Sequence, residues 1–297
     1  MKNQIEKSLV KVLALVLGIA CAQAAPAQTF KRAKVQGGAL LTQVSSGGAS
    51  VWALAGNGHP YIFKNRQFTL ANSISLTQIA VGGGNAFQAD TVWGLNSSGS
   101  IYKAHLSGST WIFSKISGVL DFIAVGPGYA DNCHPYEVWG LNPAAQIFRY
   151  NFCGKKFEQA PGTLGSLAVG GGDMWGINGN GEIYRFNFGT GGFDQLPGSL
   201  TQVTVGPNGF WGLYSDQIYE FYDNIQDFAQ LPGSLARIAA GGNGVWGLDS
   251  SGGIYRLEPT TSSFVHIPGL LTSISVGSGG GVWGINSAKH AYVFSTP

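Results

Sequence analysis

Short runs of strand-forming apolar residues recur along the chain, and small or glycine-rich turns separate them. The clearest example is the segment 92–96, which is followed by the turn 97–99 and by a second apolar run that starts at Ile101. Two strand-forming runs on either side of a small turn are typical of a β-hairpin. No long segment after residue 30 shows helical periodicity, so the pattern predicts an all-β protein.

This hairpin is repeated seven times, each time with a tryptophan in its first strand. Successive repeat tryptophans are separated by 35 to 46 residues, which is the spacing of a repeat architecture. One further tryptophan, Trp111, lies outside this register. The repeat tryptophans are Trp52, Trp93, Trp139, Trp175, Trp211, Trp246 and Trp283.

One repeat, residues 164–199, shows what each unit contains. Strand-forming runs at 164–169, 174–178, 183–188 and 193–196 are separated by turns rich in glycine. Four antiparallel strands that are repeated radially form the blade of a β-propeller. The tryptophan in each second strand is expected to pack one blade against the next; stacking on sugar rings is the alternative.

The two ends of the chain favour a closed ring over a linear solenoid. The last repeat ends at Pro297 after its third strand, while residues 30–38 resemble the fourth strand of the other repeats. The N-terminal strand is therefore expected to complete the last blade and to remove an exposed sheet edge. The prediction is a seven-bladed β-propeller of four-stranded antiparallel blades.

The Trp-Gly hairpin, the Ile-Tyr strand after it and the Leu-x-x-Ile-x-Val-Gly strand before it resemble the tectonin repeat. The resemblance covers residues 30–297. It implies a β-propeller lectin or recognition protein, because several tectonin proteins bind sugars on microbial or cell surfaces. The better-known members have six blades, whereas this chain has seven repeats. The expected ligands are glycans or cell-surface polysaccharide; the alternative is an extracellular platform that binds a protein partner on one propeller face.

The first 24 residues have the composition of a secretory signal peptide. Three lysines precede the apolar run 12–20, and Ala22-Gln23-Ala24 matches a cleavage site. The run is too short to span a bilayer. We therefore expect a signal peptide at 1–24, a single propeller at 25–297, and a secreted or periplasmic protein. Lipid attachment at Cys21 and a buried N-terminal helix are the alternatives.

Charge and catalytic motifs exclude other classes of function. Residues 25–297 hold 14 basic and 14 acidic residues, so their summed charge supplies no positive field, and nucleic acid and anionic membranes are not expected partners. The five histidines occupy unlike positions, and the sequence has no nucleophile elbow, HExxH motif or phosphate loop. We expect a protein that is not an enzyme and that uses no cofactor.

Two cysteines remain beyond the signal segment, Cys133 and Cys153. A hairpin that turns around residues 143–145 places Trp139 opposite Arg149, and its continuation brings Cys153 close to Cys133. In an exported protein this geometry predicts a disulfide. Metal ligation by these cysteines with His134 is the alternative, although the sequence shows no fourth ligand.

Two long insertions, residues 85–91 and 129–137, interrupt adjacent repeats between their first and second strands. Both are expected on the same propeller face, where loops vary freely. Acidic, amide and aromatic side chains together suit sugar recognition; a solvated polar loop is the alternative. The candidate ligand-binding residues are Phe87, Asp90, Tyr129, Asp131, Asn132, His134 and Tyr136.

The opposite face carries a second candidate set, one residue from each of five hairpin turns. Asparagine and aspartate are most often turn formers at such positions, and ligand contact is the alternative. This set consists of Asn96, Asn142, Asn178, Asp249 and Asn286.

Overall fold

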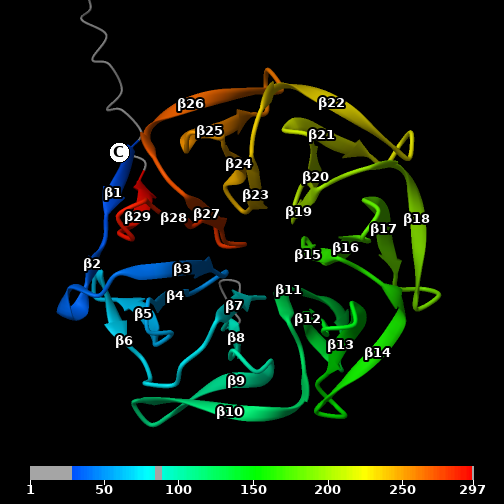
Figure 1. Cartoon of the computed structure of the whole chain (residues 1–297). Coiled ribbons are helices and arrows are strands. Elements are labelled where there is room, and N and C mark those ends of the chain that lie inside the picture. Colours follow the sequence, from blue (N-terminus) through cyan, green and yellow to red (C-terminus); the bar gives the residue numbers. More distant parts are fainter. Residues whose placement is uncertain (1–28, 84–88, 296–297) are drawn as a thin grey trace, which may run out of the picture.

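The computed structural model describes residues 29–83 and 89–295, and it shows seven β-sheets arranged as the blades of a ring (Figure 1). Each blade has four antiparallel strands, and one blade carries an additional fifth strand. The predicted all-β, seven-bladed propeller is therefore confirmed. No helix within the described residues is long and apolar enough to cross a membrane.

Five blades are continuous in sequence, and their strands follow one another from the axis outwards. The second blade contains β7 (Gln78–Gly82), β8 (Thr91–Leu95), β9 (Ser100–Ser107) and β10 (Thr110–Val119). The third contains β11 (Phe122–Asp131), β12 (His134–Leu141), β13 (Gln146–Asn151) and β14 (Lys156–Thr163). The fourth contains β15 (Ser166–Gly170), β16 (Asp173–Ile177), β17 (Glu182–Asn187) and β18 (Gly192–Ser199). The fifth contains β19 (Gln202–Gly206), β20 (Gly209–Tyr214), β21 (Gln217–Tyr222) and β22 (Asp227–Ser234), and the sixth contains β23 (Arg237–Gly241), β24 (Gly244–Leu248), β25 (Gly253–Glu258) and β26 (Ser263–Leu270).

The closing blade combines both ends of the described chain. Its strands are β27 (Ser273–Val276), β28 (Val282–Ile285), β29 (Ala291–Ser295) and the N-terminal β1 (Thr29–Arg32). Strand β1 pairs antiparallel with β29, with Thr29 opposite Ser295, and the two strands lie side by side in Figure 1. The predicted closure of the ring by the N-terminal strand is confirmed.

The N-terminal segment also reaches the first blade, which the sequence did not predict. This blade contains β3 (Leu41–Ser46), β4 (Val51–Ala55), β5 (Pro60–Lys64) and β6 (Gln67–Leu70). Strand β2 (Lys34–Val35) pairs with β6 in parallel and forms its fifth strand. The predicted single strand at 30–38 is thus divided between two blades. The short 3-10 turn η1 (Gln36–Gly38), with Gly37 and Gly38 at positive φ, then redirects the chain into β3.

The fourth strands are longer than the sequence indicates. The predicted strand 193–196 continues through Pro197 and Gly198 to Ser199, because a bulge between Glu182 and Ile183 re-registers its pairing with β17. Gly198 adopts φ +92° at this bulge, a conformation that glycine tolerates best. Pro197 and Gly198, which follow the predicted strand, therefore belong to the sheet.

The repeat tryptophans join neighbouring blades. Trp139 is fully buried and meets Phe186 of the fourth blade edge to face, with ring centroids 4.7 Å apart. Trp52 meets Trp111 of the second blade in the same way at 4.8 Å, which explains the tryptophan outside the repeat register. Edge-to-face packing adds about 0.5–1.5 kcal/mol to the burial of each pair. The packing role predicted for the repeat tryptophans is confirmed.

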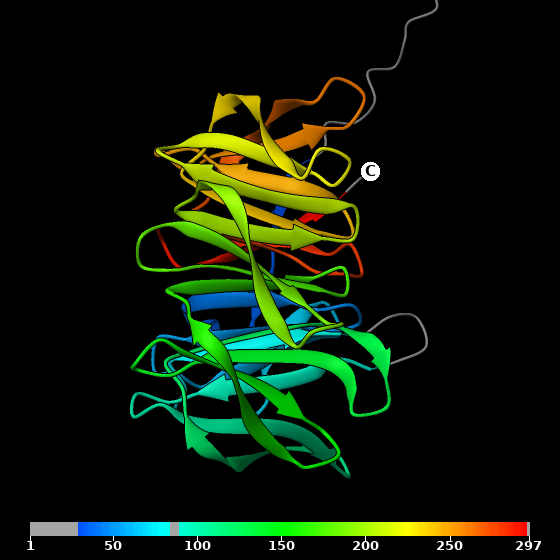
Figure 2. The ribbon, with the colours of Figure 1, turned by 90° about the vertical axis from the view of Figure 1, so that its right-hand side faces the viewer.

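A glycine near the loop end of the inner strands allows the blades to approach the axis closely. A Cβ atom on Gly170 would lie 2.2 Å from the carbonyl oxygen of Val205, and one on Gly126 would lie 2.6 Å from Val169. Any side chain at these positions would push adjacent blades apart. Figure 2 views the ring from its edge, with turns emerging on two opposite faces. We call "loop face" the side that carries the connections between first and second strands and between third and fourth strands.

Candidate ligand-binding face

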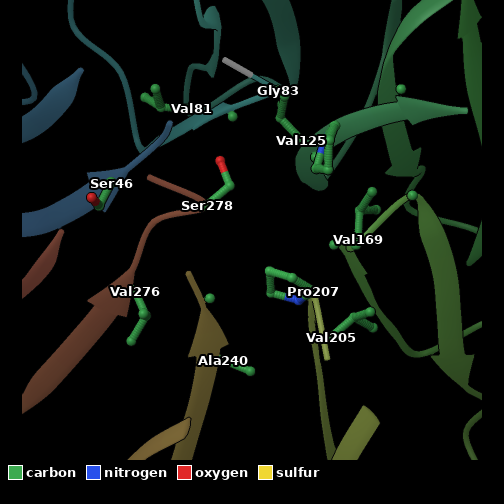
Figure 3. Close-up of a pocket in the computed structure, with 18 residues that line it drawn as sticks. Ser46, Val81, Gly83, Val125, Val169, Val205, Pro207, Ala240, Val276 and Ser278 are labelled. Carbon is green, nitrogen blue, oxygen red and sulfur yellow. The ribbon is translucent and has the colours of Figure 1, made fainter. Parts of the chain in front are cut away.

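The inner strands surround a cavity of about 330 Å³ at the loop-face end of the axis (Figure 3). Most blades contribute the same repeat position, so the wall is a ring of small apolar side chains with exposed glycine backbone. No ionisable side chain is among the described residues that line it. The cavity therefore offers apolar and backbone contacts rather than acid–base chemistry. The ring consists of Val81, Val125, Val169, Val205, Ala240 and Val276, with Ser46 in the first blade.

The insertion at 85–91 connects the second blade to the first blade by hydrogen bonds. Phe87 lies outside the described residues, but Asp90 is described and lies directly before β8. Its carboxylate accepts hydrogen bonds from the backbone N–H groups of Gly48 (2.8 Å) and Ser50 (2.6 Å) and from the Ser50 hydroxyl (2.7 Å). Asp90 thus orders the β3–β4 loop, and a direct role in sugar binding stays a prediction.

The second predicted insertion is a braced turn between β11 and β12. Asp131 accepts hydrogen bonds from the backbone N–H groups of Cys133 (2.8 Å) and His134 (2.7 Å), and His134 Nδ1 lies 2.8 Å from its other oxygen. Partial burial raises the pKa of Asp131, but the hydrogen bond and charge of His134, together with the backbone hydrogen bonds from Cys133 and His134, outweigh burial and lower the pKa overall. Asn132 is exposed at the tip of the turn, and the side chain of Tyr129 lies outside the described part of the structure.

Cys133 and Cys153 form the predicted disulfide, with their Cα atoms 5.0 Å apart. The hairpin register that led to this prediction is also present, because Trp139 pairs with Arg149. Both sulfurs are covalently joined, so the alternative of thiolate metal ligation is wrong.

Tyr136 joins the two insertions. Its hydroxyl donates a 2.7 Å hydrogen bond to the carbonyl oxygen of Ala89 in the second blade, and its ring lies 5.7 Å from that of Phe152. The structure therefore brings the described residues of both predicted loops together. Whether they contact a ligand stays a prediction.

The candidate set on the opposite face forms its own turns. The side-chain oxygen of Asn178 accepts hydrogen bonds from the N–H groups of Asn180 (2.9 Å) and Glu182 (3.0 Å), and Asp249 binds Ser251 and Gly253 in the same way. The pKa of Asp249 is lowered, chiefly by the Ser251 hydroxyl. Asn96, Asn142 and Asn286 repeat the bond to the residue four positions later. These oxygens satisfy the turn backbone, as expected of turn formers.

A cavity of about 460 Å³ lies on the loop face at the edge of the fourth and fifth blades, and sequence reasoning missed it. Arg185 crosses its wall, with ion pairs to Asp173 (2.8 Å) and to Asp223 of the fifth blade (2.9 Å). Burial lowers the pKa of Arg185, but the two carboxylates outweigh burial and raise it overall. The side chains that line the cavity include Asp173, Arg185, Phe186, Asn187, Phe188, Asp194 and Gln226.

Another cavity, of about 250 Å³, lies between the fifth and sixth blades. Trp211 and Glu220 line it from paired positions on β20 and β21. The indole nitrogen of Trp211 is buried and finds no hydrogen-bond acceptor among the described residues. A buried N–H group without a partner costs about 1–3 kcal/mol, so an acceptor supplied by a ligand would be favoured here.

In the first three blades, the residue two positions before the tryptophan satisfies its indole N–H group. Ser50, Thr91 and Glu137 accept this hydrogen bond from Trp52, Trp93 and Trp139. The fifth blade has a glycine, Gly209, at the same position. Gly244 and Gly281 stand at the same position before Trp246 and Trp283, so this feature of the sequence does not by itself indicate the cavity at Trp211.

The fold and these cavities define a β-propeller with ligand-sized recesses at its blade interfaces. The Tectonin domain model matches residues 28–191 and 163–296, so the chain belongs to the tectonin family. The resemblance seen in the repeats is thereby confirmed. A search of curated proteins gives no match.

Three solved structures share the fold at low sequence identity. YCF48 from Cyanidioschyzon merolae aligns with a TM-score of 0.64 and 10% identity, over 90% of this chain and 98% of that one. A structure of YCF48 bound to D1 peptide aligns with a TM-score of 0.67 and 12% identity, over 92% and 98%. The extracellular domain of the putative one component system BT4673 from B. thetaiotaomicron gives 0.63 and 11%, over 90% of this chain and 40% of that one. At these identities the likeness concerns the fold alone.

Proposed function

We propose that this propeller is a lectin-like, non-catalytic protein that binds carbohydrate through cavities on its loop face. The observation that carries the proposal is the cavity beside β17, where the carboxylates of Asp173 and Asp194, the Arg185 guanidinium and the Asn187 amide accompany phenylalanine rings. A concave site with a few convergent polar groups is the usual form of a small-ligand site.

The chemistry of these groups fits a sugar. Carboxylates and guanidinium groups form paired hydrogen bonds with adjacent hydroxyl groups, and an aromatic face suits the apolar C–H side of a pyranose ring. Asn187 Nδ2 donates to Asp194 at 2.9 Å, which orients the carboxylate within the cavity. The site thus presents ordered polar groups beside an apolar surface.

Several weak sites on one face would act together on a polysaccharide. The cavity at Trp211 lies one blade further round the ring, and the inserted loops of the second and third blades lie on the same face. We include the exposed Asn132 and the loop residues Phe87 and Tyr129 as further contacts in this proposal. Linked sites gain avidity without any new contact, because the second binding event is intramolecular.

We further propose that the protein works outside the cytoplasm, in the periplasm or after secretion. The Cys133–Cys153 disulfide supports this, because disulfides persist in oxidising compartments. The predicted signal peptide at 1–24 lies outside the described residues.

Binding to a glycan array and to insoluble cell-wall material tests the function. Asp194→Ala should weaken binding at least tenfold while the melting temperature stays close to wild type, because Ala229 occupies the same register position in the fifth blade. Glu158→Ala is the matched control, since Glu158 holds that position in the third blade. Equal loss of binding in both variants, or no binding by the wild type, would contradict the proposal.

A protein-interaction platform is the second candidate function. It is favoured by the structural neighbour YCF48 bound to D1 peptide, and by the apolar central cavity. Ala240→Met should fill that cavity and abolish peptide binding while glycan binding persists. A variant that loses glycan binding instead would place the sugar site at the axis.

A further inference from the structure

Formal charge is divided sharply between two parts of the ring. Residues 25–89 contain five basic residues and no acidic residue, and residues 259–297 contain one lysine and no acidic residue. Residues 90–258 contain eight basic and fourteen acidic residues. Residues 25–297 are therefore neutral in sum, but residues 25–89 and 259–297 together carry +6 and residues 90–258 carry −6.

All six of these basic residues lie in the closing and first blades, which we call the seam. Arg32 and Lys34 extend from β1 and β2, which bridge the two blades at the rim of the ring (Figure 1). All six are exposed, and none has a carboxylate within ion-pair distance in the described ranges. The six are Lys31, Arg32, Lys34, Lys64, Arg66 and Lys289.

The seam also contains a recess of about 400 Å³. Arg32, Lys34 and His290 line it together with the amide of Gln67. The backbone holds these groups in place, because Lys34 pairs with Gln67 and the N–H of Ala33 donates to the Ala291 carbonyl at 2.9 Å. Two unpaired cations beside an amide form a site for an anionic group that also carries hydroxyls.

We propose that the seam binds an acidic polysaccharide, with one sugar carboxylate held by Arg32 and Lys34 and neighbouring hydroxyl groups by Gln67. A guanidinium group matches a carboxylate in bidentate geometry, and charge-assisted bonds are about twice as strong as neutral ones. The remaining lysines extend the positive field along the rim and attract further acidic residues of the polymer. No phenylalanine, tyrosine or tryptophan lines the recess within the described chain, so it lacks the stacking platform typical of single-stranded nucleic-acid binding.

This inference rests on the proposed function only in its choice of a carbohydrate ligand, because the seam recess and the loop-face cavities share no residue. Binding of neutral glycans that survives loss of the seam cations would leave the loop-face proposal intact. Binding of acidic glycans that survives Asp194→Ala would leave the seam proposal intact. The two proposals therefore fail separately.

The test measures binding of full-length exported protein to oligogalacturonate, to its methyl ester and to an oligodeoxythymidylate of equal charge. Oligogalacturonate should bind, its methyl ester should bind at least tenfold more weakly, and higher salt should weaken the acidic ligand alone. Arg32→Gln with Lys34→Gln should reduce oligogalacturonate binding at least tenfold. Lys115→Gln with Lys155→Gln removes the same charge from exposed positions in the second and third blades and should change little.

Three results would overturn the proposal. The methyl ester could bind as well as the acid, which would show that charge is not recognised. The oligodeoxythymidylate could bind more tightly than the oligogalacturonate, which would assign the seam to nucleic acid. Salt-sensitive self-association lost in Arg32→Gln with Lys34→Gln, without glycan binding, would instead assign the seam to the fifth blade of a second copy, which carries Asp216, Glu220, Asp223 and Asp227 and no basic residue.

Discussion

The third and fifth blades have the same fold but opposite chemistry around their tryptophans. In the third blade, the fully buried Glu137 accepts the Trp139 indole N–H at 2.7 Å and the Arg149 Nε–H at 2.8 Å. In the fifth blade, Gly209 replaces the glutamate and Glu220 takes the place of the arginine. The interface beside Trp139 is filled by an ion pair, whereas the interface beside Trp211 opens into a cavity.

This difference shows how a repeat protein separates stability from binding. Glu137 and Arg149 stabilise the third blade. Gly209 and Glu220 occupy the same positions in the fifth blade, where they leave space for a ligand. The cost is a buried N–H group on Trp211 without a partner in the described chain.

The largest loss of stability is expected from opening the ring, because both blades under comparison depend on the closed propeller. Deleting residues 25–37 eliminates β1 and β2, and leaves β29 as an exposed sheet edge. The protein should aggregate or lose its cooperative melting transition in calorimetry. A truncated protein that stays monomeric with an unchanged melting temperature would falsify the closure argument.

The second effect tests the filled interface directly. Glu137→Ala leaves the partly buried Arg149 beside Trp139 without its fully buried carboxylate, so the free energy of unfolding should fall by about 3–5 kcal/mol in urea titration. Glu220→Ala in the fifth blade should cost less than about 1 kcal/mol, because its carboxylate accepts one hydrogen bond, from the Tyr222 hydroxyl. Similar losses in the two variants would remove the contrast between the blades.

The third effect concerns the disulfide, which the fifth blade lacks. Replacing Cys133 and Cys153 by serine should lower the free energy of unfolding by about 2–4 kcal/mol, because the closed loop restricts the unfolded chain. Non-reducing peptide mass spectrometry should show the bond in the wild type. Two free thiols in exported protein would show that the loop is not braced.

The smallest effect should come from converting the fifth blade toward the third. Glu220→Arg places a guanidinium over Trp211, as Arg149 lies over Trp139 at 5.5 Å and Arg256 over Trp246 at 5.7 Å. The cation–π contact should add about 0.5–1 kcal/mol to stability, measured in urea, and should weaken glycan binding on an array. Lower stability would show that the cavity does not accept the larger side chain.

The fold was predictable because each repeat contains the same local pattern of strand-forming runs and turns. The seven repeat tryptophans indicated the number of blades, and the likeness of residues 30–38 to a fourth strand indicated how the ring closes. The pairing of Lys34 and Val35 with β6 was not predictable, since a two-residue parallel pair depends on where the ring places its neighbours. The disulfide was predictable because hairpin register is a local property.

The site was less accessible to prediction than the fold. The unusual loops contain Asp90 and Asp131, whose carboxylate oxygens accept backbone hydrogen bonds and order the loops. The cavities at Arg185 and Trp211 form between blades and involve residues that are regular members of the repeat. Gly209 is visible in the sequence, but Gly244 and Gly281 occupy the same repeat position, so it does not locate a cavity.

The closing blade has a consequence for the order of folding. Its partners Thr29 and Ser295 are the first and last described residues, so the pair with the greatest sequence separation completes the ring. Each internal blade pairs strands that are close in sequence and can form early, whereas closure must wait for the whole chain and for a large loss of loop entropy. During synthesis, β1 therefore emerges first and reaches its native partner last.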